Sequence, residues 1–88
     1  MALAGVMRRA GGADIAVTVR NLSTRGMMAE CALAFSRGEP VEIELPGIGT
    51  VAGNVAWMTG GRVGATFAAP IDPSLARKPF SSNRTPPD

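Results

Sequence analysis

The sequence has no histidine, no tyrosine and a single cysteine among its 88 residues. Histidine is the side chain that most often performs general acid–base catalysis near neutral pH, so its absence argues against an enzyme. The lone Cys31 excludes an intrachain disulfide and a zinc site built from paired cysteines. We interpret Cys31 as a small buried hydrophobic residue and expect the reducing cytoplasm as the compartment. The sequence therefore predicts no catalytic residue, no bound metal and no cofactor.

Long hydrophobic runs are also missing. No stretch approaches the roughly 20 apolar residues that a membrane-spanning helix requires. The apolar start, residues 1–7, is too short for a signal-peptide core, and Arg8 and Arg9 follow it instead of preceding it. We expect a chain without a membrane span.

What the chain does contain favours one small all-β domain. Hydrophobic residues make up 45% and charged residues 18%, which is typical of a globular protein rather than a disordered one. Eleven glycines and seven prolines indicate many turns. A chain of this length buries about 60% of its unfolded surface, which suffices for a small core.

Alternation of apolar and polar residues predicts five strands joined by short turns. The expected strands are 15–20, 27–33, 41–45, 50–58 and 62–68. Thr59-Gly60-Gly61 resembles a tight hairpin turn. Gly53 indicates a bulge or sharp bend in the fourth of these strands, and Trp57 on the same strand is expected in the core or at the barrel mouth. Five such strands form a sheet that must curl into a small antiparallel barrel or be covered.

The carboxyl-terminal part of the sequence predicts a short helix. Asp72 and Pro73 have the composition of an N-cap and first helical residue, and Pro79 would stop the helix after one or two turns. We expect an amino-terminal arm over residues 1–13, a barrel over 14–79 and a disordered tail over 80–88.

A polar turn, Asn21-Leu22-Ser23-Thr24-Arg25-Gly26, directly follows the first expected strand. Asn21 and Ser23 can bond to a ligand or to nearby backbone, and Gly26 permits positive φ or close backbone approach. Arg20 and Arg25 make this turn cationic, which suits an anionic ligand. The alternative is that Asn21 and Ser23 only stabilise their own turn.

The order of these landmarks resembles a PilZ domain over residues 14 to about 72. The landmarks are the N-x-S-x-x-G turn, an Arg-Gly-Glu-Pro turn, Val-Glu-Ile-Glu-Leu, Gly-Asn-Val-Ala-Trp and Arg-Val-Gly-Ala-Thr-Phe. The resemblance implies a small antiparallel β-barrel that binds the bacterial second messenger cyclic di-GMP. In the family, a (D/N)xSxxG turn contacts one guanine, and an RxxxR stretch ahead of the first strand clamps phosphate and guanine.

Asn21, Ser23 and Gly26 match the turn motif of the family residue by residue. Arg8 and Arg9 do not complete an RxxxR motif, because Gly12 and Ala13 stand four residues after them. Arg8, Arg9 and Arg25 are nevertheless the candidates for contacts with the phosphates. We therefore expect cyclic di-GMP as the ligand, bound weakly because the arginine clamp is incomplete.

The short distance between Arg9 and Asn21 suggests that the barrel lacks its first strand. A missing strand would leave an unpaired sheet edge, which invites pairing with another chain. We accordingly expect either a homodimer formed through this edge or an unidentified protein partner.

Two other functions remain open. The first is a PilZ-like module that no longer binds nucleotide and acts through protein contacts. The second is a small basic barrel that binds nucleic acid, suggested by an isoelectric point near 9.5. Three phenylalanines and one tryptophan offer few surfaces for base stacking, and the net charge is only +2, so nucleic acid is the less favoured partner.

Overall fold

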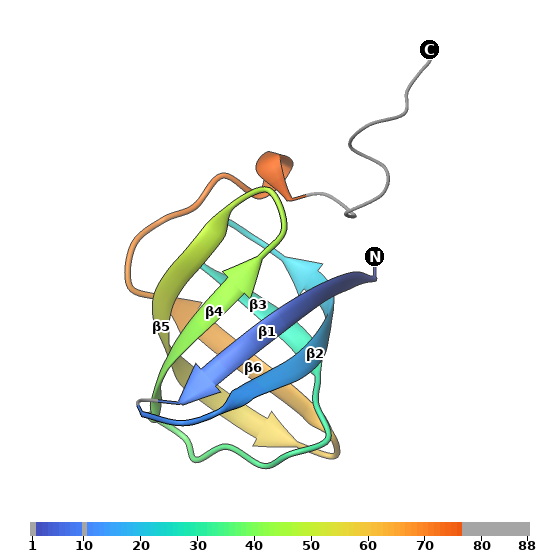
Figure 1. The fold of residues 1–88 in the computed structure, drawn as a ribbon, viewed down its shortest axis with the longest axis vertical. Coiled ribbons are helices and arrows are strands. Elements are labelled where there is room, and N and C mark those ends of the chain that lie inside the picture. Colours follow the sequence, from blue (N-terminus) through green and yellow to red (C-terminus); the bar gives the residue numbers. More distant parts are fainter. Residues whose placement is uncertain (1, 10, 77–88) are drawn as a thin grey trace.

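The computed structural model describes residues 2–9 and 11–76. Six antiparallel strands form a closed barrel in the order β1-β2-β3-β6-β5-β4 (Figure 1). The strands are β1 (Leu3–Arg9), β2 (Asp14–Leu22), β3 (Gly26–Glu30), β4 (Pro40–Leu45), β5 (Gly49–Thr59) and β6 (Arg62–Phe67). The prediction of a small antiparallel β-barrel is confirmed.

The first strand is present, contrary to the sequence-based expectation. β1 pairs with β2 on one side and with β4 on the other, and this pairing closes the barrel. The segment expected to be an arm therefore contributes a strand, and the predicted open edge does not exist. Buried Leu3, Gly5 and Met7 alternate regularly with exposed Ala4 and half-buried Val6. It was obscured in the sequence because alanine and glycine occupy much of the strand and have low β-propensity.

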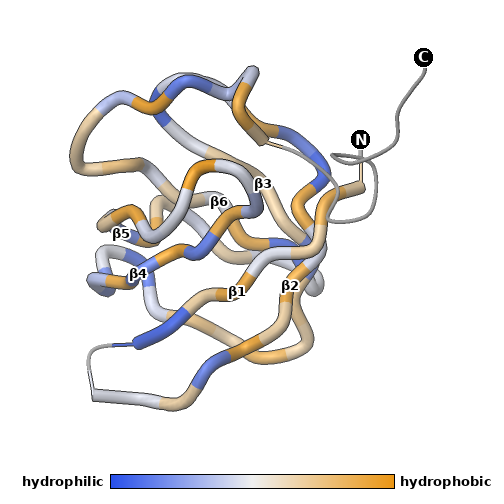
Figure 2. The backbone as a smooth tube through the Cα atoms, turned by 45° about the horizontal axis from the view of Figure 1, so that its top comes forward, coloured by the Kyte–Doolittle hydropathy of each residue, from blue (hydrophilic) through white to orange (hydrophobic). Residues whose placement is uncertain are grey.

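Inward-facing side chains from every strand form the core, together with Cys31 and Phe35 from the loop between β3 and β4. Its members, all buried, are Leu3, Met7, Val17, Val19, Met27, Ala29, Cys31, Phe35, Val41, Ile43, Leu45, Val55, Val63, Ala65 and Phe67. No polar or charged side chain is buried within the described part of the chain. The expected burial of Cys31 is confirmed. Figure 2 shows the hydrophilic carboxyl end of β1, where the strand leaves the apolar part of the barrel.

The hairpin between β5 and β6 forms as predicted. Thr59 pairs with Arg62, so Gly60 and Gly61 are its two loop residues. Their φ angles are 54° and 79°. Two successive positive φ angles are what a type I′ turn needs, and glycine adopts them without the steric penalty of a side chain.

The bulge in β5 lies at Ala56 and not at Gly53. The register shifts between Val55, which pairs with Ala65, and Trp57, which pairs with Gly64. Because one extra residue reverses the alternation, Trp57 faces outward and is 41% exposed, so its predicted place in the core is wrong. Gly53 instead allows close approach, since a Cβ there would lie 2.6 Å from the carbonyl oxygen of Thr66.

The expected carboxyl-terminal helix is a single 3₁₀ turn, Pro73–Leu75. Its start is as predicted: Asp72 is the N-cap and accepts a hydrogen bond of 3.0 Å from the Ser74 amide. Bonds from the hydroxyl and amide of Ser74 lower the pKa of the Asp72 carboxyl. The predicted tail, residues 80–88, lies outside the described residues. Within the described residues, no helix is long and apolar enough to cross a membrane.

Candidate functional site

Ser23 holds the polar turn between β2 and β3 in shape. Its backbone amide donates to the carbonyl oxygen of Gly26 at 2.9 Å, and its hydroxyl donates to the same oxygen at 3.1 Å. This bond uses the only hydrogen of the hydroxyl, but the hydroxyl oxygen can still accept a hydrogen bond from another group. Ser23 therefore stabilises its own turn and keeps accepting capacity for a ligand.

The turn is also bonded to the last residue of β6 and to the segment that follows it. The Phe67 amide donates to the carbonyl oxygen of Arg25 at 2.8 Å, and the Ile71 amide donates to that of Thr24 at 2.9 Å. Two backbone bonds from a second segment restrict the motion of a loop that would otherwise be held only at its ends. The turn is thus a fixed part of the barrel wall.

Gly26 is required by the close approach of two strands. A Cβ at this position would lie 2.6 Å from the carbonyl oxygen of Ala65 on β6, a separation that real Cβ atoms do not adopt. Its φ angle is not positive. Of the two roles considered for this glycine, the structure shows close backbone approach.

A surface pocket of about 260 Å³ opens beside the turn. It is lined by Asn21, Leu22, Ser23, Gly26, Met27, Met28, Ala56, Trp57, Gly64, Ala65 and Thr66. The three motif residues, Asn21, Ser23 and Gly26, are therefore brought together at one hollow. Asn21 is exposed, and the described residues provide no hydrogen-bond partner for its side-chain amide. The amide can thus offer both a donor and an acceptor to a ligand.

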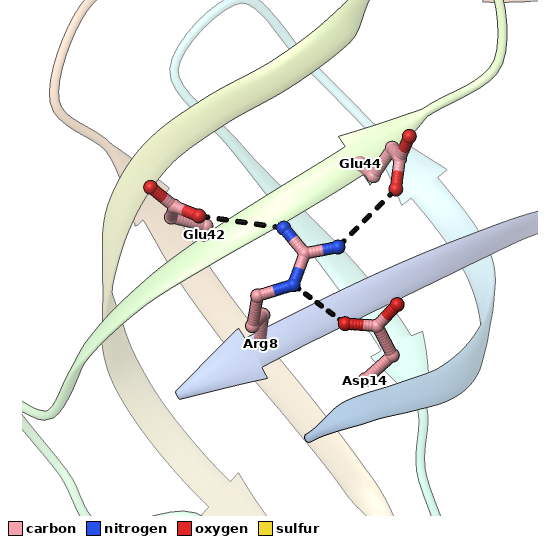
Figure 3. Close-up of polar contacts among 4 residues, drawn as sticks. All are labelled: Arg8, Asp14, Glu42 and Glu44. Atoms are coloured by element: carbon pink, nitrogen blue, oxygen red, sulfur yellow. Dashed lines mark hydrogen bonds and ion pairs between the residues drawn. The ribbon is translucent and has the colours of Figure 1, made fainter. Parts of the chain in front are cut away.

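Arg8 is engaged at a different place, on the outer face of β1, β2 and β4 (Figure 3). Its guanidinium lies 2.5 Å from the carboxylate of Asp14, 3.4 Å from that of Glu42 and 3.5 Å from that of Glu44. The hydrogen bond from Arg8 lowers the pKa of Asp14, and the same bond, with the nearby charge of Asp14, raises the pKa of Arg8. Glu42 and Glu44 share this guanidinium.

Arg9 is engaged by the loop between β3 and β4. It makes an ion pair of 2.5 Å with Glu39, donates to the carbonyl oxygen of Ala34 and stacks on Phe35 with 4.6 Å between the guanidinium carbon and the ring centroid. The bond from Arg9, followed by one from the Ser36 amide, lowers the pKa of Glu39.

The two arginines and the polar turn lie at opposite ends of β2. Arg8 pairs in register with Asp14, the first residue of β2, whereas Asn21 is seven residues further along the strand. At about 3.3 Å per residue, this separation is roughly 23 Å along the strand. The structure therefore does not bring Arg8 and Arg9 to the pocket.

Arg25 is at the pocket end of the barrel. It is part of the turn itself and is exposed, as is Arg20 at the end of the preceding run. Neither guanidinium makes an ion pair with the described residues. These two arginines are the cations that the fold leaves available near the pocket.

Sequence reasoning missed the contribution of β5 and β6 to the pocket. Trp57 and Ala56 come from β5, while Gly64 and Thr66 come from β6. A strand register that includes a bulge decides which of these residues face the pocket, and no residue pattern in β5 marks that bulge. Among the described residues, no cluster of three or more histidine, cysteine or acidic side chains could hold a metal ion.

A family model of the PilZ domain matches residues 2–79. The chain belongs to the PilZ domain family. PilZ domains are binding and regulatory domains, not catalysts. The match includes β1, in agreement with a barrel that has all its strands. Because the arginine stretch of PilZ domains lies ahead of the first strand, Arg8 and Arg9, at the end of β1, do not occupy its place. No curated protein matches the chain.

Proposed function

We propose that this PilZ domain binds cyclic di-GMP at the pocket beside Asn21, Ser23 and Gly26. The observation that carries the proposal is the exposed Asn21 amide, which has no partner in the described residues and opens on a pocket that the other two motif residues also line. The family relationship supports the choice of ligand class, and the geometry of the turn supports the proposed place.

The chemistry of the pocket fits a guanine edge. Guanine presents N–H donors on its Watson–Crick edge and acceptors at O6 and N7. The Asn21 amide can donate and accept at once, and the Ser23 hydroxyl oxygen can accept. The pocket therefore offers one base the pairing groups that its polar edge requires.

The phosphates would be met by Arg20 and Arg25 and not by Arg8 and Arg9. The first pair is exposed on the side of the turn, whereas the second pair is bound to carboxylates at the other end of β2. A hydrogen bond to a charged group contributes about 1.5–3 kcal/mol, so binding without contacts from Arg8 and Arg9 should be weaker by a factor on the order of 10² to 10⁴ than binding with two such contacts. Starting from a site of about 1 μM, this factor gives an expected dissociation constant on the order of 0.1–10 mM for these 88 residues.

Isothermal titration with cyclic di-GMP tests the proposal. Wild-type protein should release heat and saturate, and Asn21→Ala should weaken binding by about 5- to 150-fold, as expected for the loss of a two-bond contact to a base. Asn54→Ala is the matched control, because Asn54 is an amide on β5 that does not line the pocket. Equal affinity of the Asn21→Ala variant and wild type would place the ligand elsewhere.

A second candidate function is a PilZ-like protein-interaction module without nucleotide binding. The ion pairs of Arg8 and Arg9 with acidic side chains favour this second function, because both arginines are then unavailable to a phosphate. This candidate predicts neither heat nor amide chemical-shift changes around 21–26 at millimolar cyclic di-GMP.

A further inference from the structure

The outer face of β1, β2 and β4 carries a surplus of negative charge. One guanidinium, that of Arg8, lies among three carboxylates, those of Asp14, Glu42 and Glu44. One positive charge against three leaves two negative charges uncompensated within this group, which we call the acidic face. The three carboxylate side chains are 53 to 61% exposed, so a further cation can approach them from the solvent.

A surface pocket of about 590 Å³ adjoins the acidic face, and we call it the β1 hollow. Glu44 lines it together with Ala4, Val6 and Ala16. Val6 pairs with Ala16 on β2 and with Glu44 on β4, so these three residues form one outward-facing row. Because Ala4 and Ala16 are small and exposed and Val6 is only half-buried, the hollow has an apolar floor with a carboxylate at its edge.

The net positive charge of the chain lies entirely in residues 77–88. Residues 1–76 contain six arginines and six acidic residues, so their formal charges cancel. The last twelve residues contain Arg77, Lys78 and Arg84 against one acid, which accounts for the net charge of +2. Phe80 is the one large apolar residue among them. Cations on both sides of an aromatic residue complement an apolar floor beside carboxylates.

This segment starts within reach of the β1 hollow. Ala76, the last described residue, and Ile48, in the turn between β4 and β5, both pack against the core. Figure 1 shows the 3₁₀ turn at the same end of the barrel as the turn that joins β4 and β5. Pro46 and Gly47 of that turn line the hollow. At about 3.3 Å per residue, residues 77–84 span up to roughly 26 Å, which exceeds the roughly 20 Å length of β4.

We propose that residues 77–84 dock on the acidic face and the β1 hollow of their own chain. Arg77 and Lys78 meet the carboxylate of Glu44, and Phe80 lies in the hollow. Charge-assisted hydrogen bonds and burial of an aromatic ring both favour this contact. The β1 hollow shares no lining residue with the pocket beside Asn21, so the contact is separate from the proposed nucleotide site.

A spin label on the segment tests this contact in the full chain. Cys31 is the only cysteine, so a protein with Cys31→Ala and Ser82→Cys carries one nitroxide, at position 82. The amide signals of Ala16 and Glu44 should lose more intensity than that of Thr24, which is held at the same end of the barrel by its bond to Ile71. Equal losses at Thr24 and Glu44, or no loss at either, would overturn the proposal.

Charge variants show whether the acidic face causes the contact. Glu42→Gln combined with Glu44→Gln should abolish the preferential loss in the labelled protein, and high salt should reduce it. Glu30→Gln is the matched control, because Glu30 is an exposed acid on β3, outside the acidic face and the hollow. Urea unfolding checks that each variant is folded. An undiminished loss in the double variant, or an equal reduction by Glu30→Gln, would overturn the role of the acidic face.

A mixing experiment separates docking within one chain from docking on a second copy. Wild-type protein labelled with ¹⁵N is mixed with an equal amount of unlabelled protein that carries the nitroxide. Unchanged intensities at Ala16 and Glu44 in the mixture support docking within one chain. Losses there would mean that the segment occupies a neighbouring molecule, and they would overturn the intramolecular contact.

Discussion

Polar and charged residues gather beside both ends of β2, but their bonding differs between the two ends. At the start of the strand, Arg8 and Arg9 are tied to carboxylates from β2, β4 and the loop before β4. At its end, Asn21 has no partner in the described residues, and Arg20 and Arg25 make no ion pair there. The polar groups at the first end are bonded to one another, whereas those at the second end are the ones that we propose for ligand binding.

The comparison shows that residue type alone does not identify a ligand-binding residue. Arginine is suited to phosphate, yet a guanidinium bound to three carboxylates carries a surplus of negative charge around it. An anion approaching Arg8 would meet Asp14, Glu42 and Glu44 first. The absence of bonded partners, together with the chemistry of the side chains, is therefore our reason for proposing the site at the Asn21 end.

The largest effect on stability should come from the motif glycine. Gly26→Ala forces a Cβ against the carbonyl oxygen of Ala65, and overpacking of this kind costs about 1–3 kcal/mol of unfolding free energy. Urea denaturation measures the loss, with Ala4→Ser on the exposed face of β1 as the control. An unchanged denaturation midpoint would show that β3 can move away from β6. Such movement would remove the reason for glycine at this motif position.

The second prediction compares a variant at the Arg8 end of β2 with a variant at the Asn21 end. Arg8→Gln leaves three neighbouring carboxylates without their cation, so it should lower the denaturation midpoint while cyclic di-GMP affinity stays within about twofold of wild type, because Arg8 lies far from the pocket. Asn21→Ala should do the reverse, with stability within about 0.5 kcal/mol of wild type and weaker binding. Weaker binding by Arg8→Gln with intact folding would contradict the separation of the two ends.

Acidic pH should weaken the ion pairs at the Arg8 end of β2 and leave ligand binding at the Asn21 end unaffected. The pKa values of Asp14 and Glu39 lie below their ordinary values of 3.8 and 4.5, because each carboxylate is bound by an arginine. Their contribution to stability is full above those ordinary values and is lost as the pH falls through the lowered folded-state pKa values. Thermal unfolding at a series of acidic pH values should show the loss, and it should be shallower in Arg8→Gln. A loss of equal steepness in this variant would exclude Asp14 as a source.

The smallest effect concerns the choice of asparagine in the motif. Asn21→Asp replaces an amide by a carboxylate that can accept from two N–H groups of guanine in charge-assisted bonds. Repulsion from the ligand phosphates opposes this gain, so we expect a change in affinity of only a few-fold, toward tighter binding. Titration at two salt concentrations separates the terms, since higher salt should weaken the repulsion. Weaker binding at both would mean that Asn21 acts as a donor.

The barrel and the motif turn were predictable from the sequence because their signals are local. Val41–Leu45 alternates along one strand, Gly60 and Gly61 mark a hairpin, and Asn21, Ser23 and Gly26 lie within six residues of one another. These features need no knowledge of the strand order, and the structure confirms the strand, the hairpin and the barrel.

The features that the sequence did not predict depend on contacts between segments far apart in the chain. β1 was missed because its small residues give a weak alternation signal, which only pairing with β2 and β4 makes regular. Trp57 was placed on the wrong face because a single bulged residue, Ala56, reverses the pattern. The partners of Arg8 come from β2 and β4, so its capture could not be read from its neighbours in the sequence.

The central claim is that the Asn21 end of β2, and not the Arg8 end, receives the ligand. A titration of ¹⁵N-labelled protein with cyclic di-GMP, followed by amide and indole chemical shifts, tests it most directly. The account predicts saturable shifts at residues 21–26 and at the Trp57 indole N–H, with the amides of Arg8, Asp14 and Glu42 unmoved. Shifts centred on Arg8 and Arg9, or no saturable shift at millimolar ligand, would contradict it.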